Sequence, residues 1–203
     1  PHGLISPLSQ VAYGIGDANN PNLLPIFHLT REKYGLIPNV TTNGAYLDET
    51  AIRQWGQVLG AVAVSNYGEI CLDTIEAFTR LTPLVVNIHQ LLSVDTIDEC
   101  YRIINLAKTD PRLSKLGAIV FLILKPQGRG KSLEQLKGFE EYKKLIDFAF
   151  DMGINFGMDS CSCSSFERVA AERPDGEQII AMTDRCEAGA FSLYANHEAR
   201  VFP

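Results

Sequence analysis

The chain has 203 residues, of which 46% are hydrophobic, and its formal net charge is −6. This length and apolar content predict one well-buried domain with at most a small appendage. The negative charge and the lack of a dense Lys/Arg cluster exclude a surface built for nucleic acid or anionic lipid. No apolar run approaches the length that spans a bilayer and no secretory signal pattern opens the chain, so we expect a cytoplasmic protein that does not bind membranes.

Apolar runs of strand length alternate with amphipathic segments over most of the chain. Segments of this length connect neighbouring parallel strands through right-handed crossovers, and nearly continuous apolar strands are typical of sheets buried in α/β proteins. The pattern predicts an α/β fold, specifically a partial parallel (β/α)6 TIM-like barrel. Strands are expected at residues 10–15, 36–42, 61–65, 83–93, 117–126 and 154–160, and helices at residues 22–35, 48–60, 69–81, 94–108 and 132–153.

Helix starts and the end of the barrel are also suggested by the sequence. Asp48 is placed to cap the second helix, and Asp95 or Thr96 is placed to cap the fourth. After Ser160 the alternation stops, residues 161–178 read as loop, and residues 186–203 read as a two-stranded ribbon. We therefore divide the chain into a barrel at residues 1–159 and a small cysteine-bearing appendage at residues 160–203.

The five cysteines are an odd number in a chain of ordinary core size, so a secreted disulfide framework is not expected. Cys71 and Cys100 lie inside helical patterns among apolar neighbours, and we interpret them as small hydrophobic residues of the core. Cys161, Cys163 and Cys186 lie in polar segments and are candidates for metal ligands.

Polar residues stand where several of the predicted strands end. Ligands bind at the carboxyl ends of the strands in parallel barrels, so residues gathered there are candidates for a binding site. Asn43 also forms a common turn pair with Gly44, and His89 is equally consistent with a core histidine. The candidates are Thr42 and Asn43 after the second strand, Ser65 at the end of the third, Asn87 and His89 near the end of the fourth, and Lys125 at the end of the fifth.

Several of these runs resemble the radical SAM enzyme family. The loop GIGDANNP is similar to the Gly-Gly-Glu-Pro loop of that family, and VTTNG, AVAVS, VVNIHQLLS and VFLILKPQGRG follow in the family's order and spacing. The resemblance implies a radical SAM barrel in which S-adenosylmethionine and a [4Fe–4S] cluster generate a 5′-deoxyadenosyl radical. It implies cofactor contacts from Gly14, Gly16, Asp17, Thr42, Asn43, Ser65, Asn87 and Lys125.

The chain departs from the family in one defining feature, because no CxxxCxxC motif is present. Since the family places this motif just upstream of the GIGD strand, we expect it to precede Pro1 in an intact protein. The other interpretation is a relative that does without the catalytic cluster, which would make the barrel a cluster-free binding module.

The C-terminal segment resembles the auxiliary-cluster extension, called SPASM or twitch, of peptide-modifying radical SAM enzymes. The resemblance rests on Cys186-Glu-Ala-Gly189 and on a ribbon that ends in Phe-Pro. It implies that Cys161, Cys163 and Cys186 are ligands of an auxiliary iron–sulfur cluster, and that the substrate is a peptide or protein. A zinc site and incidental loop thiols are the alternatives.

Lys125 supports one alternative of a different chemical class. A Lys at the carboxyl end of a barrel strand is also how Schiff-base aldolases present their nucleophile. The run KPQGRG that begins at Lys125 fits instead a loop bordering the adenine of S-adenosylmethionine, as the radical SAM resemblance implies.

Overall fold

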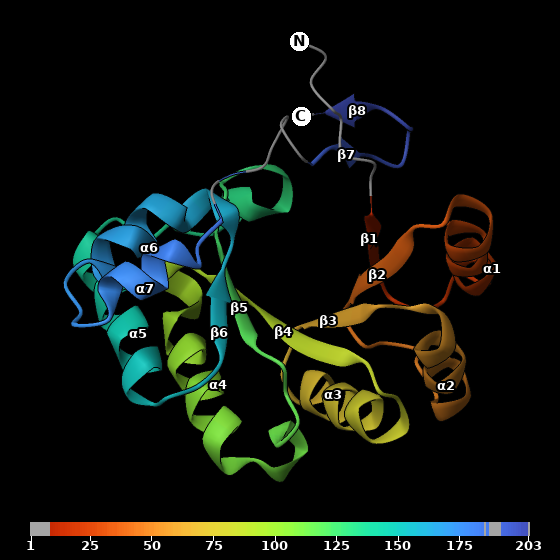
Figure 1. Ribbon diagram of the computed structural model, residues 1–203, viewed down its shortest axis with the longest axis horizontal. Coiled ribbons are helices and arrows are strands. Elements are labelled where there is room, and N and C mark those ends of the chain that lie inside the picture. The colour runs from red at the N-terminus through yellow and green to blue at the C-terminus, as the bar shows by residue number, and fades with distance from the viewer. Residues whose placement is uncertain (1–8, 185, 187–191, 203) are drawn as a thin grey trace.

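The computed structural model describes residues 9–184, 186 and 192–202. Its centre is a six-stranded, entirely parallel sheet in which the strands lie side by side in chain order. The α/β class and a parallel sheet with alternating helices are thus confirmed, and this arrangement is consistent with a partial barrel. The strands are β1 (Gln10–Gly16), β2 (Ile37–Thr42), β3 (Ala61–Ser65), β4 (Val85–Leu92), β5 (Ile119–Ile123) and β6 (Phe156–Met158) (Figure 1).

Helices follow the strands in alternation. Short 3-10 turns at Val94–Thr96, Pro111–Leu113, Gly128–Ser132 and Ser160–Ser162 complete the connections. The helices are α1 (Leu23–His28), which continues as a π-helical turn at Leu29–Lys33, α2 (Glu49–Val58), α3 (Glu69–Leu81), α4 (Ile97–Thr109), α5 (Phe139–Asp151), α6 (Cys163–Ala170) and α7 (Gly176–Ala181).

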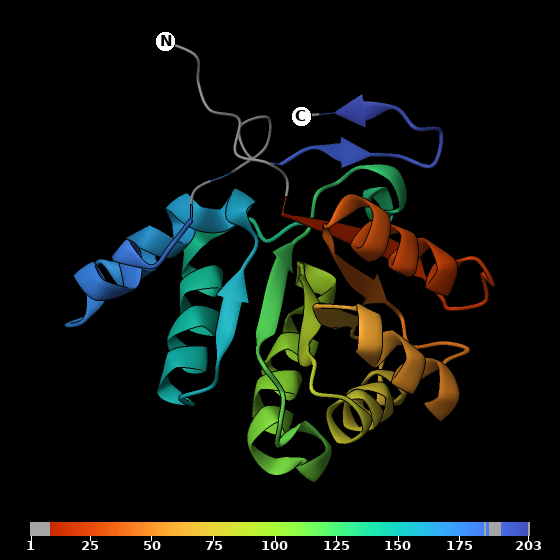
Figure 2. The same ribbon diagram turned by 45° about the vertical axis from the view of Figure 1, so that its right-hand side comes forward.

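The sheet carries its helices on one side. Because right-handed crossovers between strands in sequential order always pass the same face, α1 to α5 lie along the outer side of the curved sheet (Figure 1 and Figure 2). The strand side chains follow this arrangement, since buried and partly exposed residues alternate along β2 and β4. The inner face of the sheet is therefore not covered by any of these helices.

The helix boundaries have identifiable local causes. Asp48 caps α2 as expected, with its carboxylate accepting from the backbone N–H of Ala51 at 2.7 Å. Thr96 is the N-cap residue of α4, but its hydroxyl donates to the carbonyl of Leu91 at 2.7 Å instead of capping the helix. Gly35 follows the π-helical turn in the left-handed conformation, with φ of 66°.

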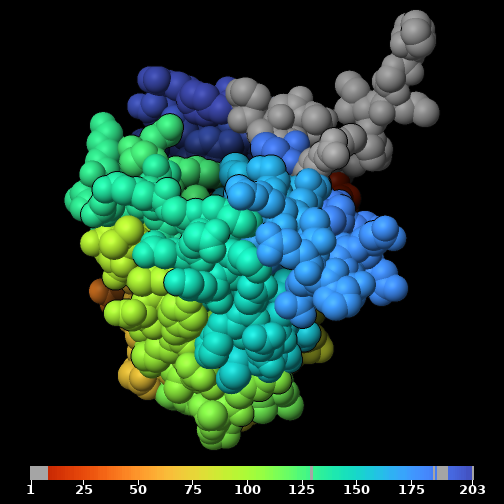
Figure 3. Space-filling view, turned by 90° about the vertical axis from the view of Figure 1, so that its left-hand side faces the viewer, coloured from red at the N-terminus to blue at the C-terminus, as the bar shows by residue number. Residues whose placement is uncertain are grey.

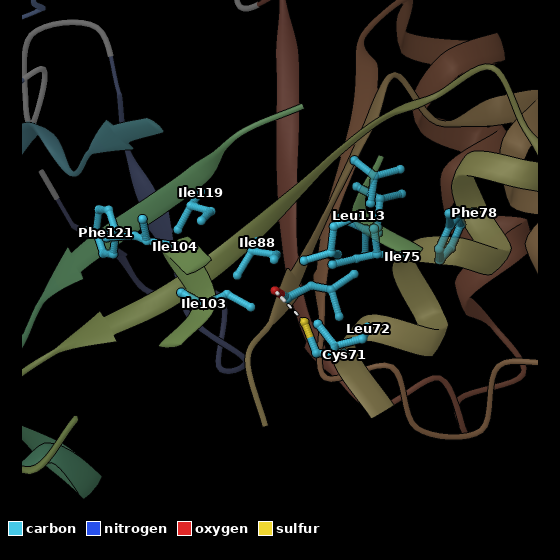
Figure 4. Packing of buried hydrophobic residues seen from close by; sticks show 14 of the residues in the cluster. Cys71, Leu72, Ile75, Phe78, Ile88, Ile103, Ile104, Leu113, Ile119 and Phe121 are labelled. Atoms are coloured by element: carbon cyan, nitrogen blue, oxygen red, sulfur yellow. Dashed lines mark hydrogen bonds between the residues drawn. The ribbon is translucent and has the colours of Figure 1, made fainter. Parts of the chain in front are cut away.

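One hydrophobic core fills the space between the outer face of the sheet and the helices. Cys71 and Cys100 are fully buried in it, as predicted for small hydrophobic residues, and burial raises the pKa of each thiol to about 12. Figure 4 shows Cys71 beside Leu72 and Ile75 with its thiol directed at the carbonyl of Val64. These two thiols are therefore part of the packing.

Two predictions about helices are wrong. The helix expected at residues 132–153 begins only at Phe139, because Gly138 before it is extended, with φ of −121° and ψ of 139°. Residues 161–178, expected to be loop, contain α6 and the start of α7. Val169 of α6 is fully buried in the main core, so the alternation of strand and helix continues beyond Ser160.

The C-terminal ribbon is confirmed in its described part. β7 (Tyr194–Ala195) pairs antiparallel with β8 (Val201–Phe202), and residues 196–200 connect the two strands. Within the described part of the chain, every helix is too short or too polar to cross a membrane.

Candidate functional site

The part of the inner face on β1 to β4 is crossed by a row of small and polar residues. Strand register places Gly14, Thr41, Ala63 and Asn87 in one row across β1 to β4. The register also shows that the row shares one face, because side chains at paired positions of neighbouring strands project to the same side. A row of mostly short side chains therefore crosses this part of the inner face.

A second row crosses the other half of the sheet. It contains Ser65, His89, Val120 and Gly157 on β3 to β6. The structure therefore brings Ser65 and His89 together as direct neighbours on adjacent strands. The two rows supply hydroxyl, amide and imidazole groups to one concave surface, which suits a polar organic ligand.

The end of β1 is exposed at two glycines. Gly14 and Gly16 are both exposed, and a Cβ atom added at either position would meet no atom of the described residues within 4 Å. Gly16 has φ of 67°, a conformation that glycine adopts without strain. Asp17 is exposed directly after it, and its Oδ1 accepts from the backbone N–H of Asn19 at 3.1 Å. A ligand can approach the backbone here, beside a carboxylate.

Thr42 lies on the helix-covered side of β2 with an exposure of 1%. Its hydroxyl donates to the carbonyl of Gly16 at 2.9 Å and accepts from the backbone N–H of Gly44 at 3.1 Å. Asn43 forms an Asx turn, with Oδ1 accepting from the N–H of Ala45 at 2.9 Å. Both residues therefore fix the loops around Gly16, and the turn interpretation of Asn43 is confirmed.

A polar network holds the end of β3. The amide nitrogen of Asn66 donates to Gln90 Oε1 and to Glu99 Oε1, each at 2.7 Å. The Oδ1 atom of Asn66 accepts from the N–H of Gly68 at 3.1 Å. Arg102 hydrogen-bonds to Glu99 at 2.6 Å and, as the largest cause, lowers the pKa of that carboxyl, which therefore stays ionised. The network fixes the loop that follows Ser65.

Asn87 is not near the end of its strand, which corrects the prediction from the sequence. It is the third residue of β4, and its Oδ1 would lie 2.6 Å from a Cβ atom at Gly117, in the segment before β5. The strand itself was predicted to residue 93, so the error lies in taking Asn87, in its middle, as a strand-end residue. Asn87 still belongs to the inner face, in the row of Gly14.

His89 lies on the inner face, and desolvation by burial lowers its pKa. Its imidazole is therefore neutral at pH 7 and has one nitrogen free to accept a hydrogen bond. The pKa of this histidine is lower in the folded protein than in the unfolded chain, where it is near 6.5. The unfolded chain therefore binds more protons below that pH, and the free energy of unfolding falls as the pH falls.

We expect a variant with His89→Gln to lose less stability than the wild type between pH 7 and pH 5. Glutamine keeps a polar side chain at the position but does not titrate in this range. The check is urea denaturation of both proteins at a series of pH values. Parallel stability curves for the two proteins would contradict the placement of a desolvated imidazole here.

Lys125 follows β5 and meets the end of β6. Its ammonium lies 3.7 Å from Asp159 Oδ2, and the thiol group of Cys161, followed by Asp159, raises its pKa. A Schiff-base nucleophile needs a lowered pKa so that the amine is free at neutral pH. The environment of Lys125 therefore disfavours the aldolase alternative.

The three candidate metal ligands are placed as follows. Cys161 and Cys186 are exposed, and Cys163 is half-buried with Sγ 3.5 Å from Glu167 Oε1. Among the described residues, no three His, Cys, Asp or Glu side chains converge into a group that would hold a metal ion. The thiols as placed do not form such a site, so we derive no step through an auxiliary cluster, and its presence stays a prediction.

Sequence reasoning missed three site features. Thr41, and not Thr42, is the threonine of β2 on the inner face, and Asn66 and Glu99 form the network behind Ser65. Strict alternation from the buried Val40 would have identified Thr41. The pairing of Asn66 with Glu99 joins residues far apart in the chain and leaves no local signal.

Comparison with known proteins adds no identity to this picture. A scan of protein-family models found none that matches the chain, and a search of curated proteins found no significant match. The assignment of a function therefore depends on the geometry of the inner face.

Proposed function

We propose that the chain forms the S-adenosylmethionine-binding barrel of a radical SAM enzyme that modifies a peptide or protein. The observation that carries the proposal is the uncovered inner face, where exposed backbone at Gly14 and Gly16 adjoins the polar rows. An α/β sheet with its helices on one side leaves this face and the carboxyl ends of its strands for the ligand.

The roles follow from the chemistry of each group. At Gly14 and Gly16 the backbone is open to the methionine part of the cofactor, and the carboxylate of Asp17 can accept from its ammonium. Ser65 and the neutral His89 offer a hydroxyl and an imidazole acceptor to the ribose and adenine. Thr42 and Asn43 position the loops, as their internal hydrogen bonds indicate.

Lys125 has a second role in the proposal. Its raised pKa keeps a positive charge at the carboxyl end of β5, next to Asp159 and Cys161. That charge suits the carboxylate of the cofactor or a carbonyl of the substrate. In an intact enzyme the [4Fe–4S] cluster supplies the reductive cleavage of S-adenosylmethionine, and we assign none of its ligands to the described residues.

The proposal is tested by titrating the chain with S-adenosylmethionine in a calorimeter. We expect a dissociation constant below about 1 mM, and we expect Gly14→Val to weaken binding at least about tenfold, a change of about 1.4 kcal/mol. The substitution fits the open space at this position but places a branched side chain on the inner face.

Gly138→Val is the matched control. Gly138 also has no atom within 4 Å of an added Cβ and lies at the start of α5, on the outer side. It should bind S-adenosylmethionine as the wild type does. Wild-type protein that does not bind the compound, or equal weakening by both substitutions, would overturn the proposal.

A further inference from the structure

Strand β6 has a free edge. Among the described residues it pairs only with β5, and Asn155 and Asp159 make the backbone bonds, at 3.1 Å each, to Ile119 and Phe121. Since hydrogen-bonding direction alternates along a strand, the N–H and C=O groups of Phe156 and Met158 point away from β5. Such an edge is a template for a further strand.

A pocket of about 400 Å³ lies along the same edge, between β6 and the helices α6 and α7. Figure 3 views the molecule from the side on which α5, α6 and α7 lie. The pocket wall includes the rings of Phe150, Phe156 and Phe166, and the Phe150 and Phe156 ring centroids are 4.9 Å apart and nearly perpendicular, at 79°. Its lining residues are Phe150, Phe156, Gly157, Met158, Asp159, Ser160, Cys163, Phe166, Ile179, Met182, Thr183 and Asp184.

The size and the walls of the pocket suit one large apolar side chain. Ligand pockets of about 300 Å³ and above bury drug-sized groups, and a phenyl or indole ring gains edge-to-face contacts with other aromatic rings. The ring centroid of Phe166 lies 6.2 Å from the ring centroids of both Phe150 and Phe156, so the three rings form a continuous apolar wall.

The charged residues that line the pocket are acidic, and the nearest cation behind its wall, Arg173, stacks over the Phe150 ring at 4.1 Å and pairs with Asp147 and Asp175. Asp159 and Asp184 line it, Glu167 contacts the lining residue Cys163, and the described lining residues include no Lys, Arg or His. Lys125, 3.7 Å from Asp159, offsets one of these charges. A ligand with a positive group beside its apolar part therefore complements the pocket.

We propose that the free edge of β6 accepts an extended peptide as a further strand, with an aromatic side chain in the pocket and a Lys or Arg beside the carboxylates. Peptides that add to a sheet edge gain affinity from main-chain hydrogen bonds and specificity from pockets for alternate side chains. The edge and the pocket share Phe156 and Met158, so one extended segment engages both.

The backbone part of the proposal is tested by fluorescence polarisation with a labelled Lys-Thr-Phe-Thr-Lys peptide. We expect a dissociation constant on the order of 100 µM. Two further peptides are N-methylated at every second amide, so that one peptide lacks the N–H groups of one edge and the other peptide lacks those of the opposite edge. Because only one edge of the peptide pairs with β6, the peptide methylated on the opposite edge should bind normally. The peptide methylated on the pairing edge should bind at least about tenfold more weakly. Absence of binding by the parent peptide, or equal binding by all three, would overturn the proposal.

The pocket is tested with Met182→Lys. Met182 lines the pocket but is 77% exposed, so the substitution adds a positive charge without disturbing the core. Binding should weaken about tenfold. Tyr34→Lys is the control, because Tyr34 is 60% exposed and lies after α1, by the opposite edge strand. Equal effects of the two substitutions would show that the peptide binds elsewhere.

Discussion

Replacing Gly44 by alanine should destabilise the protein by about 3 kcal/mol. Gly44 has φ of 83°, and an added Cβ would lie 2.4 Å from Thr74 Oγ1. That hydroxyl cannot turn away freely, because it donates to the carbonyl of Ile70 at 2.6 Å. The variant thus combines backbone strain with a clash between the loop after β2 and α3. Urea denaturation measures the loss as a lower midpoint.

Gly14→Ala is the control for this experiment. Gly14 lacks the positive φ of Gly44, and an added Cβ would meet no atom within 4 Å. The free energy of unfolding of the Gly14→Ala variant should stay within about 1 kcal/mol of the wild-type value. If Gly44→Ala were equally well tolerated, the close packing of the loop on α3 would be incorrect.

Asn66→Asp should cost about 2–4 kcal/mol at neutral pH, although the two side chains have nearly the same shape. The Asn66 amide is the donor to both Gln90 Oε1 and Glu99 Oε1. A carboxylate there leaves two acceptors without that donor and adds a negative charge beside ionised Glu99. The loss should shrink as the pH falls, because a protonated carboxyl donates again.

Asn43→Asp provides the matched comparison, because Asn43 forms the equivalent turn after the neighbouring strand. Among the described residues, only the Oδ1 atom of the Asn43 side chain has a hydrogen-bond partner, the N–H of Ala45, and a carboxylate accepts that bond equally well. Its stability should change by no more than about 0.5 kcal/mol. Equal losses at Asn43 and Asn66 would mean that the network behind Ser65 does not stabilise the fold.

The strands were the most predictable part of the structure. Continuous apolar runs such as Ala61–Ser65 are bounded by Gly, Pro and polar residues, and the observed strand has the same limits. Helix α3 was also predicted at its observed bounds, Glu69–Leu81, because its apolar residues follow helical spacing without interruption. Parallel order then follows from the alternation itself.

The helical predictions failed where local and tertiary preferences compete. Residues 132–138 have amphipathic spacing, but Glu134 is held in an extended connection, with its N–H donating to Asp95 at 2.8 Å. In the opposite direction, the serines and cysteines that open α6 favour loops in isolation. There the burial of Val169 and Ala170 against the barrel stabilises the helix.

The candidate site was predicted in its general location but not in every residue. Gly14, Gly16 and Ser65 lie at or near the carboxyl ends of β1 and β3 as expected, since strand ends can be located from composition. Thr42 shows the limit of such reasoning, because a shift of one position along a strand moves a side chain to the opposite face. Networks such as that of Asn66 need the tertiary structure to be identified.

The central claim, that S-adenosylmethionine binds on the inner face of the sheet, is tested most directly by nuclear magnetic resonance. Amide chemical shifts of the isotope-labelled chain are recorded while the compound is added. We predict that Gly14, Gly16 and Ser65 shift together with one dissociation constant, whereas Gly138 on the outer side does not move. Shifts confined to the outer helices, or no shifts at millimolar concentrations of the compound, would contradict the claim.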